Sequence, residues 1–408
     1  MSTTAAEAVA GAAFMGYMRP GGRVGVRNHL AVVSTVALAN RVAELAAGQC
    51  ERHLQRLPAS PGDATRVLRV AGEFQRGLQN PDARLQDEVL QRIAGHPNIG
   101  AALVLCHDRR AAQAWQQRLS ASGKPIEVLA VMDCTGVQDA IDRATSALLR
   151  LAQPVQALQR EPCPLAALTF ALECGGSDAS SAVCANPAIG RFVDAALAAG
   201  ATAIVSETAE FIGAEAVVRR QSATPEIAEA IVARIAAVEA RMAGDGDHYR
   251  GVNPTAENIE AGLTTLVEKT MGAVCKIGRS RFVGCLDFGQ QPPEPGLYFM
   301  DTPFFSPCSI TGMLAGGAQL TLFAMGVFNP SGNPLAPTLK ICGNPETTAR
   351  WADGIDLDLG ALTQGEISLD AAGARVAEAV LRTAGGQATR TEAWGEGQFI
   401  IPRMLPTF

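Results

Sequence analysis

The sequence predicts an α/β protein of two domains, each built on a mostly parallel sheet flanked by helices. Apolar runs rich in β-branched residues alternate with alanine-rich stretches of helical periodicity along most of the chain. This alternation is typical of parallel sheets whose faces are covered by helices. Prolines at both ends of residues 153–163 mark a connector. We therefore expect a loose tail over residues 1–15, an N-terminal domain over 16–160 and a C-terminal domain over 161–408.

In the N-terminal domain, structure is expected to begin near Gly16. Three apolar runs are predicted to be strands: 29–36, 99–106 and 126–132. Three helices should follow them at 38–47, 111–120 and 137–151. Residues 50–79 are polar, contain prolines and show no clear period, so no element is assigned there.

The C-terminal domain should open with a strand, helix and parallel strand. Residues 168–172 form the first strand, 173–181 a glycine-rich loop, and Asn186 with Pro187 a helix start for 188–199. The next strand is expected at 203–206 and a further helix at 225–242. Four more strands are predicted: 282–286, 297–300, 320–325 and 339–342.

Composition excludes several classes of protein. The chain has 408 residues, 48% of them hydrophobic, which is enough for ordinary buried cores. It shows no apolar run of about 18 residues and no secretory start, so we expect a cytoplasmic protein without membrane contact. A net charge of −6, with basic residues spread along the chain, argues against nucleic acid as a partner. The nucleotide-binding glycine loops and the serine hydrolase motif are absent.

Polar residues follow the first two strands predicted in the C-terminal domain. Because the carboxyl ends of parallel strands meet at one sheet edge, both loops should reach the same place. Carboxylates there could hold a divalent cation or divide general acid and base roles, and a Gly-Gly pair allows backbone amides to approach an anion. An ordinary turn is the alternative, since such residues are common in turns. The candidates are Glu173, Cys174, Gly175, Gly176, Ser177, Asp178, Ser206, Glu207 and Thr208.

Two cationic candidates lie elsewhere in the chain. Arg23, Arg27 and Asn28 stand in a glycine-rich segment before the first strand, where guanidinium groups could clamp a substrate carboxylate. A solvated hairpin is the alternative interpretation of that segment. Lys276 could act as a base or neutralise an enolate, although a lysine is more often simply exposed.

These same segments resemble the altronate and galactarate dehydratase family, which includes the large subunit of sulfolactate sulfo-lyase. The resemblance covers roughly residues 16–345, in order. It rests on GYMRPGGRVGVRN, ECGGSDASSAVCANPAIG, SETAEFIGAE, NPTAENIEAGLTTLVEKTMGAVCKIG, LDFG, GLYFMDTP and SITGMLAGGAQLTLF. It implies a lyase that eliminates water, or sulfite, from a hydroxy acid.

The resemblance also implies a divalent metal, iron or a similar ion, with Glu173, Cys174, Asp178 and Glu207 as its candidate ligands. This chain departs from the family where cysteines are expected near Leu38, within residues 53–62 and after Cys106. A different metal site, loss of the metal or completion by another subunit would each account for that departure. The family's additional small domain before the GYxR block suggests a separate small subunit as partner.

We therefore expect a hydro-lyase that converts a small sugar acid or other 2-hydroxy carboxylate into a 2-oxo acid. Lys276 is the expected base that removes the C2 proton, and Asp178 or Glu207 would bind metal or protonate the leaving hydroxyl. The alternatives are a sulfo-lyase or another C-X lyase, a different enzyme class on the same scaffold, and a non-catalytic carboxylate-binding subunit. Assembly into a homo-oligomer is expected from base rates.

Overall fold

The computed structural model describes residues 3–56, 67–74, 80–243 and 253–405. Two compact units divide the chain: unit 1 comprises residues 1–14 and 163–400, and unit 2 comprises 15–162 and 401–408. The chain passes from one unit to the other between residues 14 and 15, 162 and 163, and 400 and 401. The first two of these points lie within strands of a small sheet of order β2-β1-β7, formed by β1 (Ala13–Met18), β2 (Val24–Gly25) and β7 (Glu161–Pro164). The predicted α/β class is confirmed.

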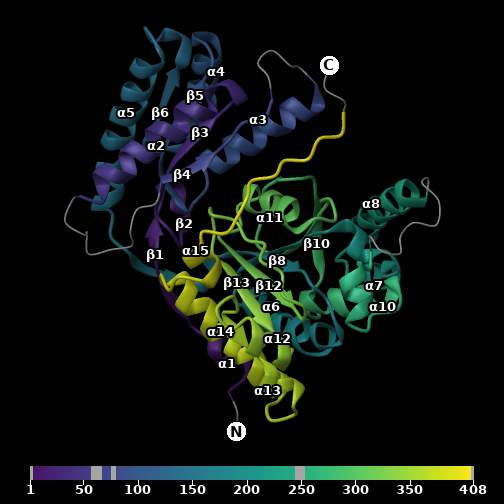
Figure 1. Cartoon of the computed structure of the whole chain (residues 1–408). Helices are drawn as coiled ribbons and strands as arrows, with labels where there is room; N and C mark the ends of the chain where they lie inside the picture. Colours follow the sequence, from purple (N-terminus) through teal and green to yellow (C-terminus); the bar gives the residue numbers. More distant parts are fainter. Residues whose placement is uncertain (1–2, 57–66, 75–79, 244–252, 406–408) are drawn as a thin grey trace. The chain divides into compact units, whose positions relative to one another are not determined.

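Unit 2 is built on a parallel four-stranded sheet of order β4-β3-β5-β6. Its strands are β3 (His29–Ser34), β4 (Val67–Val70), β5 (Ile99–Cys106) and β6 (Ile126–Ala130). Its helices are α2 (Asn40–Leu54), α3 (Pro81–Ala94), α4 (Arg109–Leu119) and α5 (Val137–Ala157). All eight residues of β5 are buried, as expected for a strand covered on both faces. Helices α2 and α5 pack side by side on the sheet (Figure 1).

Unit 1 contains a parallel seven-stranded sheet of order β10-β11-β9-β8-β12-β13-β14. Its strands are β8 (Thr169–Cys174), β9 (Thr202–Val205), β10 (Phe282–Leu286), β11 (Leu297–Met300), β12 (Leu320–Met325), β13 (Thr338–Cys342) and β14 (Leu357–Asp358). The chain extends the sheet from β8 first through β9 and later, in the opposite direction, through β12. The carboxyl end of β8 is therefore a topological switch point, where ligands of open α/β sheets bind.

Many helices surround this sheet (Figure 1). They are α1 (Ala5–Val9), α6 (Asn186–Ala198), α7 (Glu215–Arg220), α8 (Pro225–Ala243), α9 (Ala256–Glu260), α10 (Leu266–Ala273), α11 (Ser306–Ala315), α12 (Pro345–Arg350), α13 (Gly360–Thr363), α14 (Leu369–Ala384) and α15 (Arg390–Trp394). Helices α1, α6 and α14 contact one another. None of the helices in the described part of the chain combines the length and apolar character that crossing a membrane requires.

The start of the chain differs from the loose tail expected over residues 1–15. Thr4 and Glu7 form a reciprocal capping box that begins α1, and Ala5 and Val9 are buried. Gly373 of α14 makes room for this helix, because a Cβ there would stand 3.3 Å from the Cβ of Ala5. A short helix that buries only two side chains leaves little periodicity in the sequence.

Other boundaries also differ from the sequence expectations. Helix α5 continues through Pro154, so half of the expected connector is helical. Asn186 is not the helix cap, because a π-helical turn, Ser181–Ala185, precedes α6. Asp178 is the N-capping residue instead, because its Oδ1 accepts a hydrogen bond of 2.8 Å from the Ser181 amide. Within residues 50–79, α2 extends to Leu54 and β4 follows, while 57–66 and 75–79 lie outside the described residues.

Candidate functional site: a buried acid–base centre

The switch point carries a group of buried ionisable side chains. Strand β8 ends in Glu173 and Cys174, and the loop after β9 supplies Glu207 and Glu210. Both strands deliver their carboxylates to one sheet edge, as their parallel pairing requires. Two lysines reach the same edge from α10 and from the 3-10 turn Val274–Ile277. The exposed fractions are 1% for Glu173, 3% for Glu207, 1% for Glu210, 5% for Lys269 and 1% for Lys276.

Glu210 is the anion at the middle of this centre. Its Oε2 accepts a hydrogen bond from the Lys276 Nζ at 2.7 Å, and its Oε1 lies 3.5 Å from the Lys269 Nζ. The Cys174 thiol also donates to Oε1, at 3.5 Å. Although burial opposes ionisation, the two ammonium groups lower the pKa of Glu210. Glu210 is therefore ionised at neutral pH.

Glu173 and Glu207 are two further carboxyl groups of the centre, and their pKa values are raised, whereas that of Glu210 is lowered. Burial raises the pKa of Glu173 to about 7, with Lys276 opposing and Glu210 reinforcing that change. Burial also raises the pKa of Glu207 well above its usual range, and the charges of Glu173 and Glu210 add to the effect. Two interacting carboxyl groups in such surroundings hold a shared proton near neutral pH.

Hydroxyl groups orient this pair from one side. The Ser309 hydroxyl of α11 donates to Glu173 Oε2 at 2.8 Å, and the hydroxyls of Ser309 and Ser206 are hydrogen-bonded to each other. Among the described residues, Oε1 of Glu173 and Oε2 of Glu207 are buried without a hydrogen-bond partner. A buried oxygen without a partner is costly unless it carries a proton or meets a ligand. A proton on one carboxyl group would allow Glu173 and Glu207 to bond to each other.

The backbone of Glu207 is held in an unfavourable conformation. Its φ of 62° is the single positive value of a non-glycine residue in the described ranges, and such strain costs about 1–3 kcal/mol. The Glu207 amide donates to the Thr302 hydroxyl at 2.9 Å, and the Glu210 amide donates to the Glu207 carbonyl at 2.8 Å. These bonds fix where the Glu207 carboxyl group lies.

The glycine-rich loop is more tightly packed than the sequence suggested. The Gly175 amide donates to the Ala324 carbonyl, and the Gly176 carbonyl accepts from the amides of Gly326 and Val327. A Cβ on Gly176 would stand 1.9 Å from the Val327 carbonyl oxygen, so close backbone packing requires this glycine. Gly175 and Gly176 therefore allow close packing on the neighbouring loop. The Gly175 amide is hydrogen-bonded to a backbone carbonyl and is not open to an anion.

The remaining predicted side chains in this unit also bind protein groups. Asp178 caps a helix, and its Oδ2 accepts from the Asn344 side chain at 2.8 Å. The Thr208 hydroxyl donates to Asp301 at 2.6 Å, while the Ser177 hydroxyl and the Cys174 sulfur lie 3.4 Å apart. Asp178 is thus bound as a structural residue, and Glu173 is the carboxyl group that interacts with Glu207.

The arginine cluster lies in unit 2, where its members bind backbone carbonyls. Arg23 donates to Gly95 at 3.0 Å, Arg27 donates to Val26 at 2.8 Å, and the Asn28 side chain donates to Val155 at 2.7 Å. These bonds tie the glycine-rich segment to its own unit. Substrate binding by Arg23, Arg27 and Asn28 stays a prediction.

The divalent metal expected from the resemblance stays a prediction. Within the described ranges, no group of three His, Cys, Asp or Glu side chains is arranged to hold a metal ion. Asp178 is engaged as a cap and Glu210 is bound by two ammonium groups. Glu173, Cys174, Asp178 and Glu207 stay candidate ligands that the resemblance implies, and no chemical step is assigned to a metal at this centre.

The sequence places Glu210 in the loop expected to reach this edge but gives it no role, and sequence reasoning missed Lys269 and Ser309 as members of the centre. One signal was available for the lysines, because Lys269 and Lys276 are seven residues apart and share a face of a helix. Glu210 lies one helical turn after Glu207 in the same loop. Nothing local in the sequence marks Ser309, which reaches Glu173 from a helix 136 residues further along the chain.

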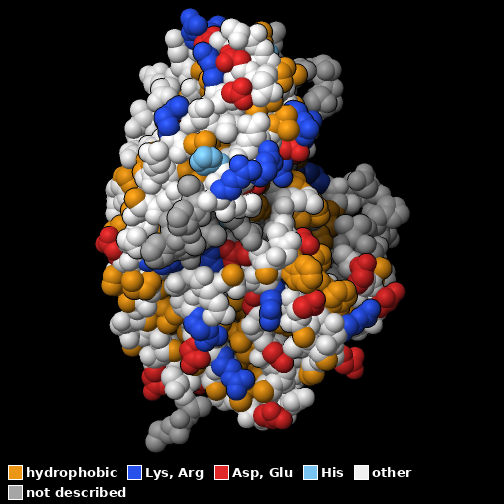
Figure 2. Space-filling model, turned by 60° about the vertical axis from the view of Figure 1, so that its left-hand side comes forward, with side chains coloured by type: hydrophobic (Ala, Val, Ile, Leu, Met, Phe, Trp, Pro, Cys, Tyr) orange, Lys and Arg blue, Asp and Glu red, His pale blue; other side chains and the backbone are white. Residues whose placement is uncertain are grey.

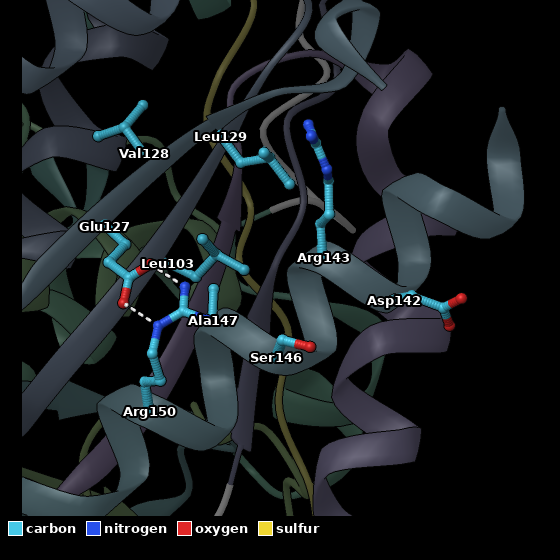
Figure 3. Close-up of a pocket in the computed structure, with 9 residues that line it drawn as sticks. All are labelled: Leu103, Glu127, Val128, Leu129, Asp142, Arg143, Ser146, Ala147 and Arg150. Atoms are coloured by element: carbon cyan, nitrogen blue, oxygen red, sulfur yellow. Dashed lines mark hydrogen bonds and ion pairs between the residues drawn. The ribbon is translucent and has the colours of Figure 1, made fainter. Parts of the chain in front are cut away.

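A hollow of about 380 Å³ lies elsewhere, along β6 and α5 of unit 2 (Figure 3). Several of its charged side chains are hydrogen-bonded to other side chains: Arg150 makes two bonds to Glu127, and Asp142 accepts from Gln138. These groups are largely exposed, as are many charged side chains on the surface (Figure 2). Exposed pairs contribute little, whereas the pair of Lys276 and Glu210 is fully buried. The chemistry is concentrated at the switch point.

The switch point of the parallel sheet holds carboxyl groups whose pKa values are shifted in different directions, beside buried ammonium groups. Such an arrangement defines an α/β enzyme centre able to move protons. Comparison with known proteins agrees with this class. Residues 165–407 match the family described as "D-galactarate/Altronate dehydratase, C-terminal", and residues 16–156 match the family described as "D-galactarate dehydratase/Altronate hydrolase, second domain". The chain belongs to the D-galactarate/altronate dehydratase family, as the resemblance indicated.

Individual relatives are lyases. The chain is 33% identical to (2R)-sulfolactate sulfo-lyase subunit beta of Chromohalobacter salexigens, over 97% of this chain and 98% of that protein. It is 31% identical to altronate dehydratase of Escherichia coli, over 86% of this chain and 70% of the relative. It is 27% identical to galactarate dehydratase (L-threo-forming) of the same organism, over 94% and 75%. Lyase activity is the activity that these relatives support.

Proposed function

We propose that this chain is a lyase that eliminates a C3 substituent from a small 2-hydroxy carboxylate, with water from a sugar acid as the first assignment. The observation that supports this proposal most is the burial of two carboxyl groups, Glu173 and Glu207, in one centre with the ammonium groups of Lys276 and Lys269. Burial raises the pKa of both carboxyl groups. Such an elimination needs a base, an acid and positive charge near the developing enolate.

The charge states suggest a division of roles. Glu173, with a pKa of about 7, is half deprotonated at neutral pH and suits the base that takes the C2 proton. Burial raises the pKa of Glu207 well above its usual range, which favours the protonated form and suits the acid that protonates the departing C3 hydroxyl. The carbon–oxygen bond then breaks, water leaves, and the enol formed between C2 and C3 becomes the 2-oxo acid.

Lys276 takes a different role from the base expected from its sequence context. Burial favours the neutral amine, but the neighbouring groups, Cys174, Glu210 and Glu173 among them, raise the pKa of Lys276 above its usual value. A lysine that stays protonated cannot accept the C2 proton. Its fixed charge instead suits stabilisation of the enolate and of the substrate carboxylate.

Sulfite elimination is the second candidate, because the relative with near-complete coverage is a sulfo-lyase subunit. Sulfite leaves as an anion and needs no proton, whereas hydroxide needs one. Glu207→Gln should therefore reduce dehydration much more than sulfite release. The name of that relative, subunit beta, also supports a separate small subunit as a partner of this chain.

The test is product release from D-altronate, galactarate and (2R)-sulfolactate by the full chain, alone and with a candidate small subunit. We expect a 2-oxo acid from at least one substrate, and a loss of about 10²–10³ in kcat for Lys276→Met. Lys276→Arg, which keeps the charge, and the surface variant Glu229→Gln are the controls. Binding of these acids without either product would support a carboxylate-binding subunit and contradict the lyase proposal.

A further inference from the structure

Residues 253–270, here called the cover segment, lie over the two loops of the acid–base centre. The Asn253 side chain donates to the Ala209 carbonyl at 3.1 Å, and its Oδ1 accepts from the Lys269 Nζ at 3.0 Å. The Asn258 side chain donates to the Ser177 carbonyl at 2.9 Å. The Thr270 hydroxyl donates to the Ile212 carbonyl at 2.9 Å. One of these hydrogen bonds thus joins the cover segment to the loop after β8, and two join it to the loop after β9.

The two lysines differ in how firmly the chain holds them. Lys276 lies in a turn packed on α6, where a Cβ on Gly190 would stand 2.3 Å from the Cys275 carbonyl oxygen. Just after it, Asp194 of α6 accepts from the amides of Arg279 and Ser280. Lys269 is positioned instead by Asn253, Glu210 and the Phe304 ring. Lys276 therefore belongs to the fixed frame, and Lys269 belongs to the cover segment.

Access to the centre requires movement, because all five of its ionisable side chains are at most 5% exposed. Glu173 ends a strand paired on both sides, so its displacement would break sheet hydrogen bonds. The cover segment consists of two short helices and turns, and a few hydrogen bonds join it to the loops. Elements with few such bonds open at the lowest free energy.

We propose that Asn258 is a positioning residue, whose bond to Ser177 couples closure of the cover segment to the arrival of Lys269 at Glu210. The catalytic significance of Lys269 rests on the proposed function. Asn258 acts through the segment and not on substrate. When its bond opens, the segment can swing about the fixed turn that holds Lys276, and the carboxyl pair becomes accessible.

The capping geometry of α9 supplies a matched pair of variants. Asn258 Oδ1 accepts from the Thr255 amide at 3.2 Å, and the Thr255 hydroxyl accepts from the Asn258 amide at 3.4 Å. Asn258→Asp keeps the capping oxygen but replaces the donor to Ser177 with an oxygen. Thr255→Ala removes the capping hydroxyl but leaves the Ser177 bond intact. The two variants therefore separate the coupling bond from the stability of the helix.

The experiment is amide hydrogen exchange of the full chain, with and without galactarate as the probe, together with kcat and KM. We expect Asn258→Asp to speed exchange over residues 256–270 by about tenfold, the loss of one hydrogen bond, and to lower kcat by a similar factor. Thr255→Ala should change kcat much less. Wild-type exchange in Asn258→Asp, or an equal loss of kcat in Thr255→Ala, would overturn the proposal. Absence of turnover in the wild type contradicts the lyase assignment instead, and the exchange contrast still decides the role of Asn258.

Discussion

The buried ion pair of Glu210 and Lys276 leads to a quantitative prediction about stability. Removing one member of a buried pair leaves the other uncompensated, which costs about 3–5 kcal/mol. Glu210→Gln leaves both ammonium groups without their anion and should cost about 5 kcal/mol. Lys276→Met leaves Glu210 with Lys269 at 3.5 Å, so about 3 kcal/mol is expected. The double variant has neither charge and should lose clearly less than the sum, with a coupling free energy of at least about 2 kcal/mol.

Urea unfolding followed by tryptophan fluorescence can report on unit 1 alone, because the three tryptophans are divided between the units. Trp115 lies in α4 of unit 2, and Trp351 and Trp394 lie in unit 1. In a Trp115→Phe background, fluorescence follows unit 1, and the four members of the cycle can be compared there. If the two single changes simply add in the double variant, the pair does not hold this centre together, and the charge states assigned to it are wrong.

Three further predictions concern pH and metal content. Because the base form of Glu173 appears only above its pKa of about 7, kcat should rise with pH through neutrality; a pH–rate profile flat from about 6 to about 8 would contradict this assignment. Burial lowers the pKa of Lys340 to about 7, so the unfolded chain binds the extra proton and the free energy of unfolding should rise from pH 7 towards the usual lysine pKa of 10.5; Lys340→Met should lose that rise in urea titrations. Elemental analysis should find equal metal content in the wild type, Asp178→Ala and Glu207→Ala, because their carboxyl groups share no ligand set among the described residues; a selective loss would show that they do bind metal.

The ends of two strands indicate the candidate centre in the sequence. The runs that form β8 and β9 are short, apolar and separated by one helix, so the amino-acid pattern alone predicts their parallel pairing and common edge. That prediction assigns the acid–base roles to Asp178 and Glu207, whereas in the structure Asp178 caps a helix and Glu173 is the carboxyl group that interacts with Glu207. The family resemblance pointed to the same loops and to Lys276, whose burial no local pattern reveals.

The properties that the sequence leaves undetermined have a physical cause. Whether a carboxylate caps a helix or faces a site depends on the loop's dihedral angles, and the π-helical turn after Asp178 has no distinctive composition. Charge states depend on neighbours that are distant in sequence. Lys276 looks like a base in isolation but is held protonated by Glu210, 66 residues earlier in the chain. Residue identity is local, whereas a pKa belongs to the assembled centre.

The proposed centre is suited to two leaving groups, and the chain is similar to both dehydratases and a sulfo-lyase. Proton removal at C2 and stabilisation of the enolate are common to both reactions, and the proposed mechanism assigns these steps to Glu173 and Lys276. Protonation of the leaving group is needed for water alone, so the protonated state of Glu207 is the feature on which dehydration depends. If Glu207→Gln abolished sulfite release as completely as dehydration, Glu207 would act before the leaving group departs, and its role would move from acid to holder of the carboxyl pair.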